Sequence, residues 1–218
     1  ESLSKIKIFN MVPKYTLHYF DMRARGELIR LILHYKGVEF VDNKIPFEKW
    51  DEFKKSHDLP FNQLPVLEFE GHALAQSYAI ARYLANELDM SGETNFEKAY
   101  LDQIVGGVED VYVRLLPTIF LERDEKIKEE KLDKFFTHNY CAWLDSFQKF
   151  LVKRENGQKF LLGSKVTWAD LALFEIIDLG LLYRNNSLLG FPLLEGYHYR
   201  VSSLPTLTGY LEERNRKE

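Results

Sequence analysis

A short block in the first half of the chain combines a strand, a tight turn and the start of a helix. Pro65 leads into the apolar run 66–69, Gly71 supplies a turn, and a helical pattern begins at Gln76-Ser77. The free N–H groups of the first helical turn, the Ser77 hydroxyl and the positive end of the helix dipole would point at one spot, which suits a carboxylate. An ordinary helix N-cap explains the same residues, so the block alone leaves both interpretations open.

The rest of the first half alternates strand and helix patterns. Residues 14–20 alternate as a strand does, and residues 25–36 carry a broad apolar face at helical spacing that ends at Gly37. Further along, a strand, a helix, a hairpin and a helix are expected over residues 38–44, 46–56, 66–75 and 76–87. The order βαβαββα predicts an α+β domain, with helices packed on a mixed four-stranded sheet.

The second half contains no convincing strand pattern. Residues 89–95 are rich in Ser, Gly, Thr, Asn and acidic residues, which is typical of a linker. Helical apolar spacing over residues 96–121, 127–153, 168–182 and 204–214 predicts an all-α domain, with a kink near Pro117. Thr167 and Asp170 form a helix-capping signal, so we interpret Asp170 as structural. We divide the chain into an extension (1–11), a mixed domain (12–89) and a helical domain (96–218).

The composition excludes several classes of function. The chain has 33 acidic and 29 basic residues, interspersed in both halves, so no basic face predicts binding to nucleic acid or membrane lipid. No apolar run approaches the roughly 18 residues that a membrane span needs. The single cysteine, Cys141, forms no Cys-x-x-Cys pair, and the six histidines lack metal-ligand spacing. We therefore expect small-molecule partners and neither dithiol nor metal chemistry.

One sequence string resembles a known enzyme family. Residues 15–27 read Tyr-Thr-Leu-His-Tyr-Phe-Asp-Met-Arg-Ala-Arg-Gly-Glu. This string is similar to sigma-class glutathione transferases, which include glutathione-dependent prostaglandin D synthases and many invertebrate enzymes. The resemblance covers residues 12–214 and implies a thioredoxin-like N-terminal domain followed by a helical domain. Sigma enzymes usually have Gly between the two arginines and Ala after the second, whereas Ala24 and Gly26 appear here in the opposite order.

The resemblance implies catalytic roles for Tyr19 and Arg25. The Tyr19 hydroxyl would donate a hydrogen bond to the sulfur of glutathione, and Arg25 would favour negative charge on that sulfur. A thiol with a pKa of about 8.5 is mostly protonated at pH 7, and lowering that pKa by about 2 units is worth about 2.7 kcal/mol. Without the resemblance, Tyr19 also fits a packed strand aromatic.

The resemblance further implies a binding set for glutathione, a homodimer and an electrophile pocket. The implied glutathione-binding residues are Tyr19, Trp50, Lys54, Gln63, Leu64, a cis-Pro65, Gln76, Ser77 and Asp110 of the partner subunit. Trp50 and Lys54 lie one helical turn apart, which suits the glycyl carboxylate but also fits an ordinary solvated helix. The electrophile pocket between the domains would be lined by Phe20, Tyr112, Leu116 and Leu207.

We therefore expect an enzyme that activates glutathione as a thiolate and conjugates it to small hydrophobic electrophiles, without a metal. Two alternatives stay open. The same site could isomerise a prostaglandin endoperoxide to prostaglandin D, or the fold could serve a non-enzymatic ligand carrier or a crystallin-like protein.

Two features favour secretion over a cytoplasmic location. Ten residues precede Met11, as expected of a mature end left by signal removal, and Asn185-Asn186-Ser187 is a glycosylation sequon in an expected loop. A glycosidase-sensitive mass shift at Asn185 in native material would support secretion, and an unmodified cytosolic pool would contradict it.

Overall fold

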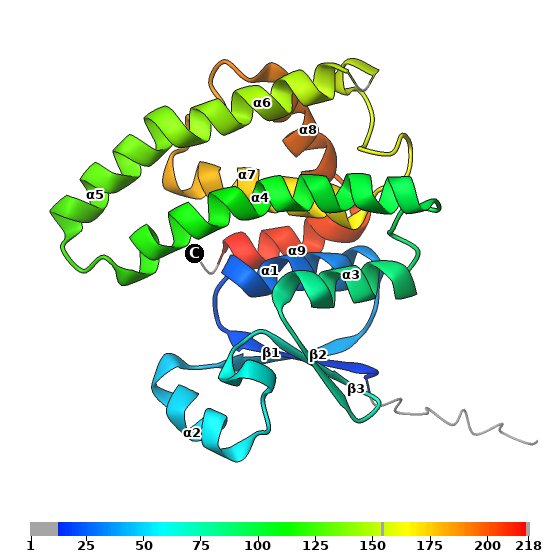
Figure 1. The fold of residues 1–218 in the computed structure, drawn as a ribbon, viewed down its shortest axis with the longest axis vertical. Helices are drawn as coiled ribbons and strands as arrows, with labels where there is room; N and C mark the ends of the chain where they lie inside the picture. Colours follow the sequence, from blue (N-terminus) through cyan, green and yellow to red (C-terminus); the bar gives the residue numbers. More distant parts are fainter. Residues whose placement is uncertain (1–12, 154, 217–218) are drawn as a thin grey trace, which may run out of the picture.

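The computed structural model describes residues 13–153 and 155–216, so the predicted extension over residues 1–11 lies outside the described part. A mixed sheet and its helices form one layer of the molecule, and a bundle of helices lies against it (Figure 1). Within the described residues, no helix combines the length and the apolar character needed to cross a membrane.

The sheet has the predicted four strands. They are β1 (Tyr15–Phe20), β2 (Phe40–Ile45), β3 (Val66–Phe69) and β4 (His72–Ala75), in the spatial order β2-β1-β3-β4. β2 runs parallel to β1, whereas β3 runs antiparallel to β1 and to β4. Alternation along β1 buries Tyr15, Leu17 and Tyr19, which are all at most 5% exposed. The first half of the predicted fold is therefore confirmed.

Three helices accompany the sheet. α1 (Glu27–Tyr35) follows a 3-10 turn (Ala24–Gly26), so the regular helix begins two residues later than predicted. α2 (Trp50–Ser56) also follows a 3-10 turn (Phe47–Lys49), and α3 (Ser77–Glu87) follows β4. α1 and α3 lie between the sheet and the helical bundle, while α2 lies on the opposite side of the sheet (Figure 1). This double packing explains why α1 is buried almost throughout.

The helical bundle contains α4 (Asn95–Leu121), α5 (Glu125–Lys134), α6 (Cys141–Val152), α7 (Trp168–Tyr183), α8 (Pro192–Ser202) and α9 (Pro205–Asn215). A π-helical turn (Phe135–Tyr140) joins α5 to α6, so these three segments correspond to the single helix predicted over residues 127–153. α4 continues past Pro117 to Leu121. The sequence analysis missed α8, which starts at a proline and carries Gly196 and only three buried residues, too weak an apolar pattern to recognise.

α7 forms the centre of the bundle and is capped as predicted. Thr167 and Asp170 form a capping box at its start, and the Asp170 carboxylate also accepts hydrogen bonds from the Leu161 N–H (2.9 Å) and the Tyr197 hydroxyl (2.5 Å). Asp170 is fully buried, so these donors compensate for its desolvation. Its interpretation as a structural residue is confirmed.

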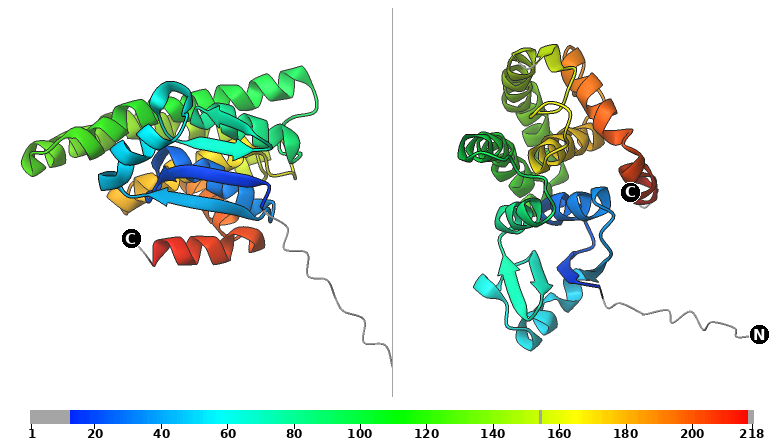
Figure 2. Two further views of the ribbon diagram at one scale, coloured as in Figure 1. Left: turned by 90° about the horizontal axis from the view of Figure 1, so that it is seen from below. Right: turned by 90° about the vertical axis from the view of Figure 1, so that its right-hand side faces the viewer.

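Seen from the sheet side, α9 lies beyond the β2 edge and α4 lies beyond the β4 edge (Figure 2). The carboxyl end of β1 and the loop that follows it are therefore enclosed by elements from both halves of the chain.

Candidate functional site

Tyr19 lies near the end of β1 with its ring buried. Its hydroxyl oxygen accepts a hydrogen bond from the backbone N–H of Arg25 (3.2 Å), so the hydroxyl proton stays available to a ligand. Burial raises the pKa of Tyr19 above its ordinary value, and the nearby Arg25 and Arg30 only partly oppose this shift. The hydroxyl is therefore neutral near pH 7 and suited to donate a hydrogen bond to an anion.

The loop after β1 contains Ala24 and Gly26, the two residues whose order is exchanged. Ala24 has a φ of 48°, in the left-handed region where glycine is favoured. A Cβ atom at Gly26 would lie 2.4 Å from Cδ1 of Tyr19, which is far closer than any real contact. Gly26 therefore allows the Tyr19 ring to pack directly against the backbone of the loop.

Arg25 is held between an acidic residue and two aromatic rings. Its guanidinium group donates two hydrogen bonds to Glu109 of α4, at 2.5 and 2.8 Å. The guanidinium carbon also lies 5.4 Å from the ring centroid of Tyr112 and 5.9 Å from that of Tyr78. The sequence analysis assigned Asp110 to the glutathione site of the partner subunit and missed Glu109. Within one chain Asp110 is exposed, and Glu109 is the residue that pairs with Arg25.

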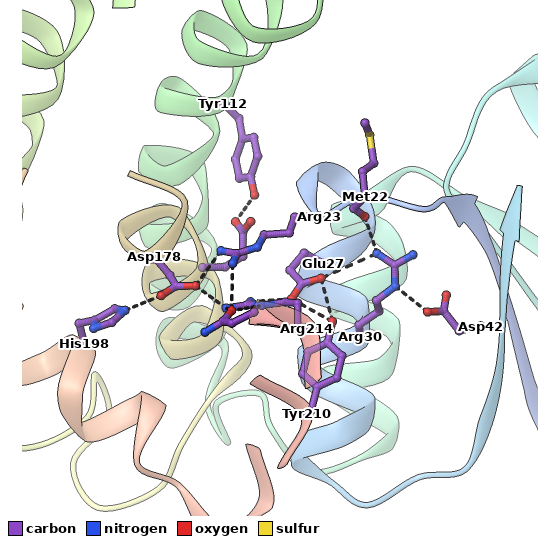
Figure 3. Close-up of polar contacts among 12 residues, drawn as sticks. Met22, Arg23, Glu27, Arg30, Asp42, Tyr112, Asp178, His198, Tyr210 and Arg214 are labelled. Carbon is purple, nitrogen blue, oxygen red and sulfur yellow. Dashed lines mark hydrogen bonds and ion pairs between the residues drawn. The ribbon is translucent and has the colours of Figure 1, made fainter. Parts of the chain in front are cut away.

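Arg30 is a buried residue near Tyr19 that the sequence analysis missed. It donates to the backbone oxygen of Met22 (2.7 Å) and to the carboxylate of Asp42 (2.9 Å) (Figure 3), and also to the backbone oxygen of Phe20 (3.2 Å). Its guanidinium carbon lies 5.8 Å from the centroid of the Tyr19 ring. Arg30 therefore fixes the chain on both sides of the turn that follows Tyr19.

Buried ion pairs connect this loop to the helical bundle (Figure 3). Arg214 of α9 donates to Glu27 of α1 (2.7 Å) and to Asp178 of α7 (2.5 Å), and Arg23 donates to the same Asp178 oxygen (2.8 Å). Burial by itself raises the pKa of Asp178, but the hydrogen bond from His198 and the charges of Arg214 and Arg23 bring that pKa below its ordinary value. These contacts set the position of α1 relative to α7 and α9.

Gln76 and Ser77 do not form an ordinary N-cap. Gln76 occupies the cap position of α3 with a φ of 73° and a ψ of 111°, and no side chain accepts a hydrogen bond from the first helical turn. Such a strained residue at a helix start is a common feature of functional sites. Its side-chain amide donates to Oε1 of Gln63 (3.4 Å), and Ser77 is nearly buried at the first position of the helix.

The remaining glutathione-binding candidates lie near one another on the sheet side. Trp50 packs with Leu64 in a small hydrophobic cluster and meets the ring of Phe20 edge-on at 5.7 Å. Lys54 lies 5.1 Å from the Trp50 ring and pairs with Asp51 (3.3 Å). The peptide bond between Leu64 and Pro65 is cis, as expected.

A cavity of about 510 Å³ opens between the domains beside Ala24. Leu116 lines it, together with Met22, Ile119, Phe120, Leu179 and Leu182. The other three residues predicted for the electrophile pocket do not line this cavity. Phe20 stacks on Phe47 at 4.5 Å, Leu207 is fully buried, and the Tyr112 hydroxyl donates to Glu175 inside the protein.

One further candidate lies elsewhere. Asn185 is exposed in the turn after α7, and whether it is glycosylated stays a prediction. Among the described residues, no three His, Cys, Asp or Glu side chains gather in a group that could hold a metal ion.

The chain matches two family models that together cover most of its length. Residues 15–86 match the N-terminal domain of glutathione S-transferase, and residues 109–214 match its C-terminal domain. The chain belongs to the glutathione S-transferase family. The predicted family and fold are thereby confirmed, and this family uses glutathione as its co-substrate.

Individual relatives agree with this family. A glutathione S-transferase of Plasmodium falciparum (isolate 3D7) is 35% identical over 93% of this chain and 96% of its own. The hematopoietic prostaglandin D synthase of Homo sapiens is 33% identical over 93% of this chain and 98% of its own. The solved structure of an Onchocerca volvulus Pi-class glutathione S-transferase superposes with a TM-score of 0.86, at 33% identity, over 94% of this chain and 95% of that one.

The contact between Gly26 and Tyr19 yields a first prediction. In Gly26→Ala, the new methyl group must displace the Tyr19 ring, and we expect kcat/KM for glutathione conjugation to fall roughly tenfold or more. Gly209→Ala is the matched control, because a Cβ atom there meets nothing within 4 Å. Equal activity of the two variants would show that the ring position is unimportant.

Proposed function

We propose that this protein ionises glutathione and transfers the thiolate to small hydrophobic electrophiles. The observation that carries the proposal is the Tyr19 hydroxyl, which is neutral, oriented by the Arg25 N–H and able to donate its proton in a hydrogen bond. A hydrogen bond to sulfur favours the thiolate over the thiol, and the thiolate is the nucleophile. The thiol proton passes to water, while Tyr19 keeps its own.

The strained start of α3 supports a site for the γ-glutamyl carboxylate. Gln76 and Ser77 lie where the free N–H groups of the helix begin, and no side chain caps them. Trp50 and Lys54 offer an indole N–H and an ammonium group to the glycyl carboxylate at the other end of the tripeptide. Glutathione would thus extend from α3 to α2 past the end of β1.

The electrophile would occupy the cavity of about 510 Å³ beside Ala24. The lining of this cavity includes apolar residues of α4 and α7 and also the polar residues Arg30, Asp42 and Tyr210. A largely apolar electrophile that carries a polar group matches this lining.

Replacing Tyr19 by Phe tests the proposal directly. Tyr19→Phe removes the hydrogen bond to sulfur, so we expect the pKa of bound glutathione's thiol to rise and conjugation to slow by about tenfold or more, while glutathione still binds. The thiolate absorbance against pH and the turnover of a model electrophile provide the measurements. Tyr199→Phe, at an exposed tyrosine of α8, is the control. Unchanged turnover of Tyr19→Phe across pH would refute the role of Tyr19, and an unshifted thiol in the wild type would favour a ligand carrier.

Isomerisation of a prostaglandin endoperoxide is a second candidate function. Similarity to hematopoietic prostaglandin D synthase over nearly the whole chain supports it. The same thiolate would attack the endoperoxide oxygen and be regenerated afterwards. Incubating the endoperoxide with the protein and glutathione should yield predominantly the D isomer. If only the uncatalysed mixture of products forms, this candidate is excluded.

We also propose a homodimer in which Asp110 reaches the glutathione of the partner subunit. Asp110 is exposed on α4, and Phe61, in the loop before Gln63, is 73% exposed with a φ of 59°. An exposed aromatic side chain held in a fixed loop is typical of an interface anchor.

The dimer is tested by sedimentation. We expect the wild type to sediment at twice the mass of one chain and Phe61→Ser to shift toward the monomer. Leu189→Ser, at an even more exposed residue in a turn (83%), should stay dimeric. Asp110→Asn should weaken glutathione binding without changing the mass. A monomeric wild type would contradict both parts of the proposal.

A further inference from the structure

Glu175 is a buried acid that the reaction described above does not use. Its side chain lies in α7 and is 1% exposed. Oε2 accepts a hydrogen bond from the Tyr112 hydroxyl of α4 (Figure 3, Tyr112), and Oε1 is buried without a hydrogen-bond partner among the described residues. A carboxyl group in this position is costly to the fold, and its presence therefore requires an explanation.

Tyr112 connects this acid to Arg25. The hydroxyl end of Tyr112 is fixed by Glu175, and the face of its ring lies 5.4 Å from the guanidinium carbon of Arg25. A second, much smaller cavity is lined by Arg25, Tyr112, Glu175 and the Ser77-Tyr78 pair, so these residues lie close together. Because Arg25 also donates its backbone N–H to the Tyr19 hydroxyl, a shift of the Tyr112 ring reaches the proposed catalytic group through one residue.

We propose that Glu175 is a positioning residue, which holds the Tyr112 ring against Arg25 and thereby fixes the Arg25 guanidinium beside the glutathione site. The proposal rests on the proposed function, because it assigns Glu175 a role in the same reaction. Glu175 itself touches neither glutathione nor the electrophile. Its effect passes through the hydrogen bond to Tyr112 and the contact of the Tyr112 ring with Arg25.

Because Glu175 can gain a negative charge, its proposed role predicts a pH dependence of activity that a merely structural residue would not cause. Burial raises the pKa of Glu175 to about 8, although the Tyr112 hydrogen bond opposes the shift. The charged or titratable groups that face it are Tyr112, Glu27, Arg23, Arg214, Tyr78, Tyr19 and Tyr140. Glu175 is thus neutral at pH 6.5, and above pH 8 it adds a negative charge beneath the site that opposes a thiolate.

A double-mutant cycle tests the connection through Tyr112. Tyr112→Phe and Glu175→Leu should each lower kcat/KM by about fivefold, and the double variant should lose no more than either single one. Tyr140→Phe is the matched control, because it removes another buried tyrosine hydroxyl, which donates to the Ile176 oxygen (3.2 Å). Additive losses, or a loss in the control as large as in Tyr112→Phe, would overturn the proposal.

The pH profile of Glu175→Gln tests it independently, even if Glu175→Leu does not fold. The amide oxygen still accepts a hydrogen bond from Tyr112, so at pH 6.5 Glu175→Gln should keep the kcat/KM that Glu175→Leu loses. Between pH 7.5 and 9, the kcat/KM of Glu175→Gln should rise relative to that of the wild type. A constant ratio of the two activities over that range would refute the proposal.

Failure of the proposed function is recognised separately. A wild type that does not lower the thiol pKa refutes thiolate activation. In that case, crystal structures of Glu175→Gln and of the control Tyr140→Phe still test the structural link, through the position of the Tyr112 ring. The link is refuted if the Tyr112 ring moves away from Arg25 in Glu175→Gln while the new amide still accepts the hydrogen bond from Tyr112.

Discussion

Buried charge pairing between α1, α7 and α9 is the interaction on which the site depends. Arg214 donates hydrogen bonds to both Glu27 and Asp178. Arg23, in the loop after β1, donates to the same Asp178 oxygen. Arg214 and Glu27 are at most 9% exposed, so leaving either one unpaired would strand a charge away from water, at a cost of about 3–5 kcal/mol. The two domains are therefore fixed in one relative position, and the cavity between them has a defined shape.

The loop that carries the chemistry is held from both sides. Arg30 bonds the backbone oxygens of Phe20 and Met22, while Gly26 allows the ring of Tyr19 to lie against the chain. Ala24 accepts a left-handed conformation that costs on the order of 1 kcal/mol relative to glycine. With Ala24 in this conformation and Gly26 free of a Cβ atom, the Tyr19 ring lies directly against the backbone of the loop.

The site combines a neutral donor with a shielded cation. Tyr19 stays protonated because burial outweighs the nearby arginines, and Arg25 shares its charge with Glu109 while two aromatic rings cover it. A guanidinium group held in this way has little freedom to reorganise, which is the condition under which a fixed charge stabilises an anion effectively.

Local patterns in the sequence determined the strands, the helices other than α8, the mixed sheet and the capping box at Thr167, because periodicity and caps act over a few residues. Local patterns also located the start of α3 at Gln76-Ser77, while resemblance supplied the catalytic roles expected of Tyr19 and Arg25. Tertiary structure alone decided that Arg25 pairs with Glu109, 84 positions away, and that Arg214 meets Glu27 across 187 positions. Tertiary structure also turned Tyr112 inward and buried Leu207. The packing of the two domains decides which face of a helix meets the cavity, and the spacing of residues within one helix does not encode this packing.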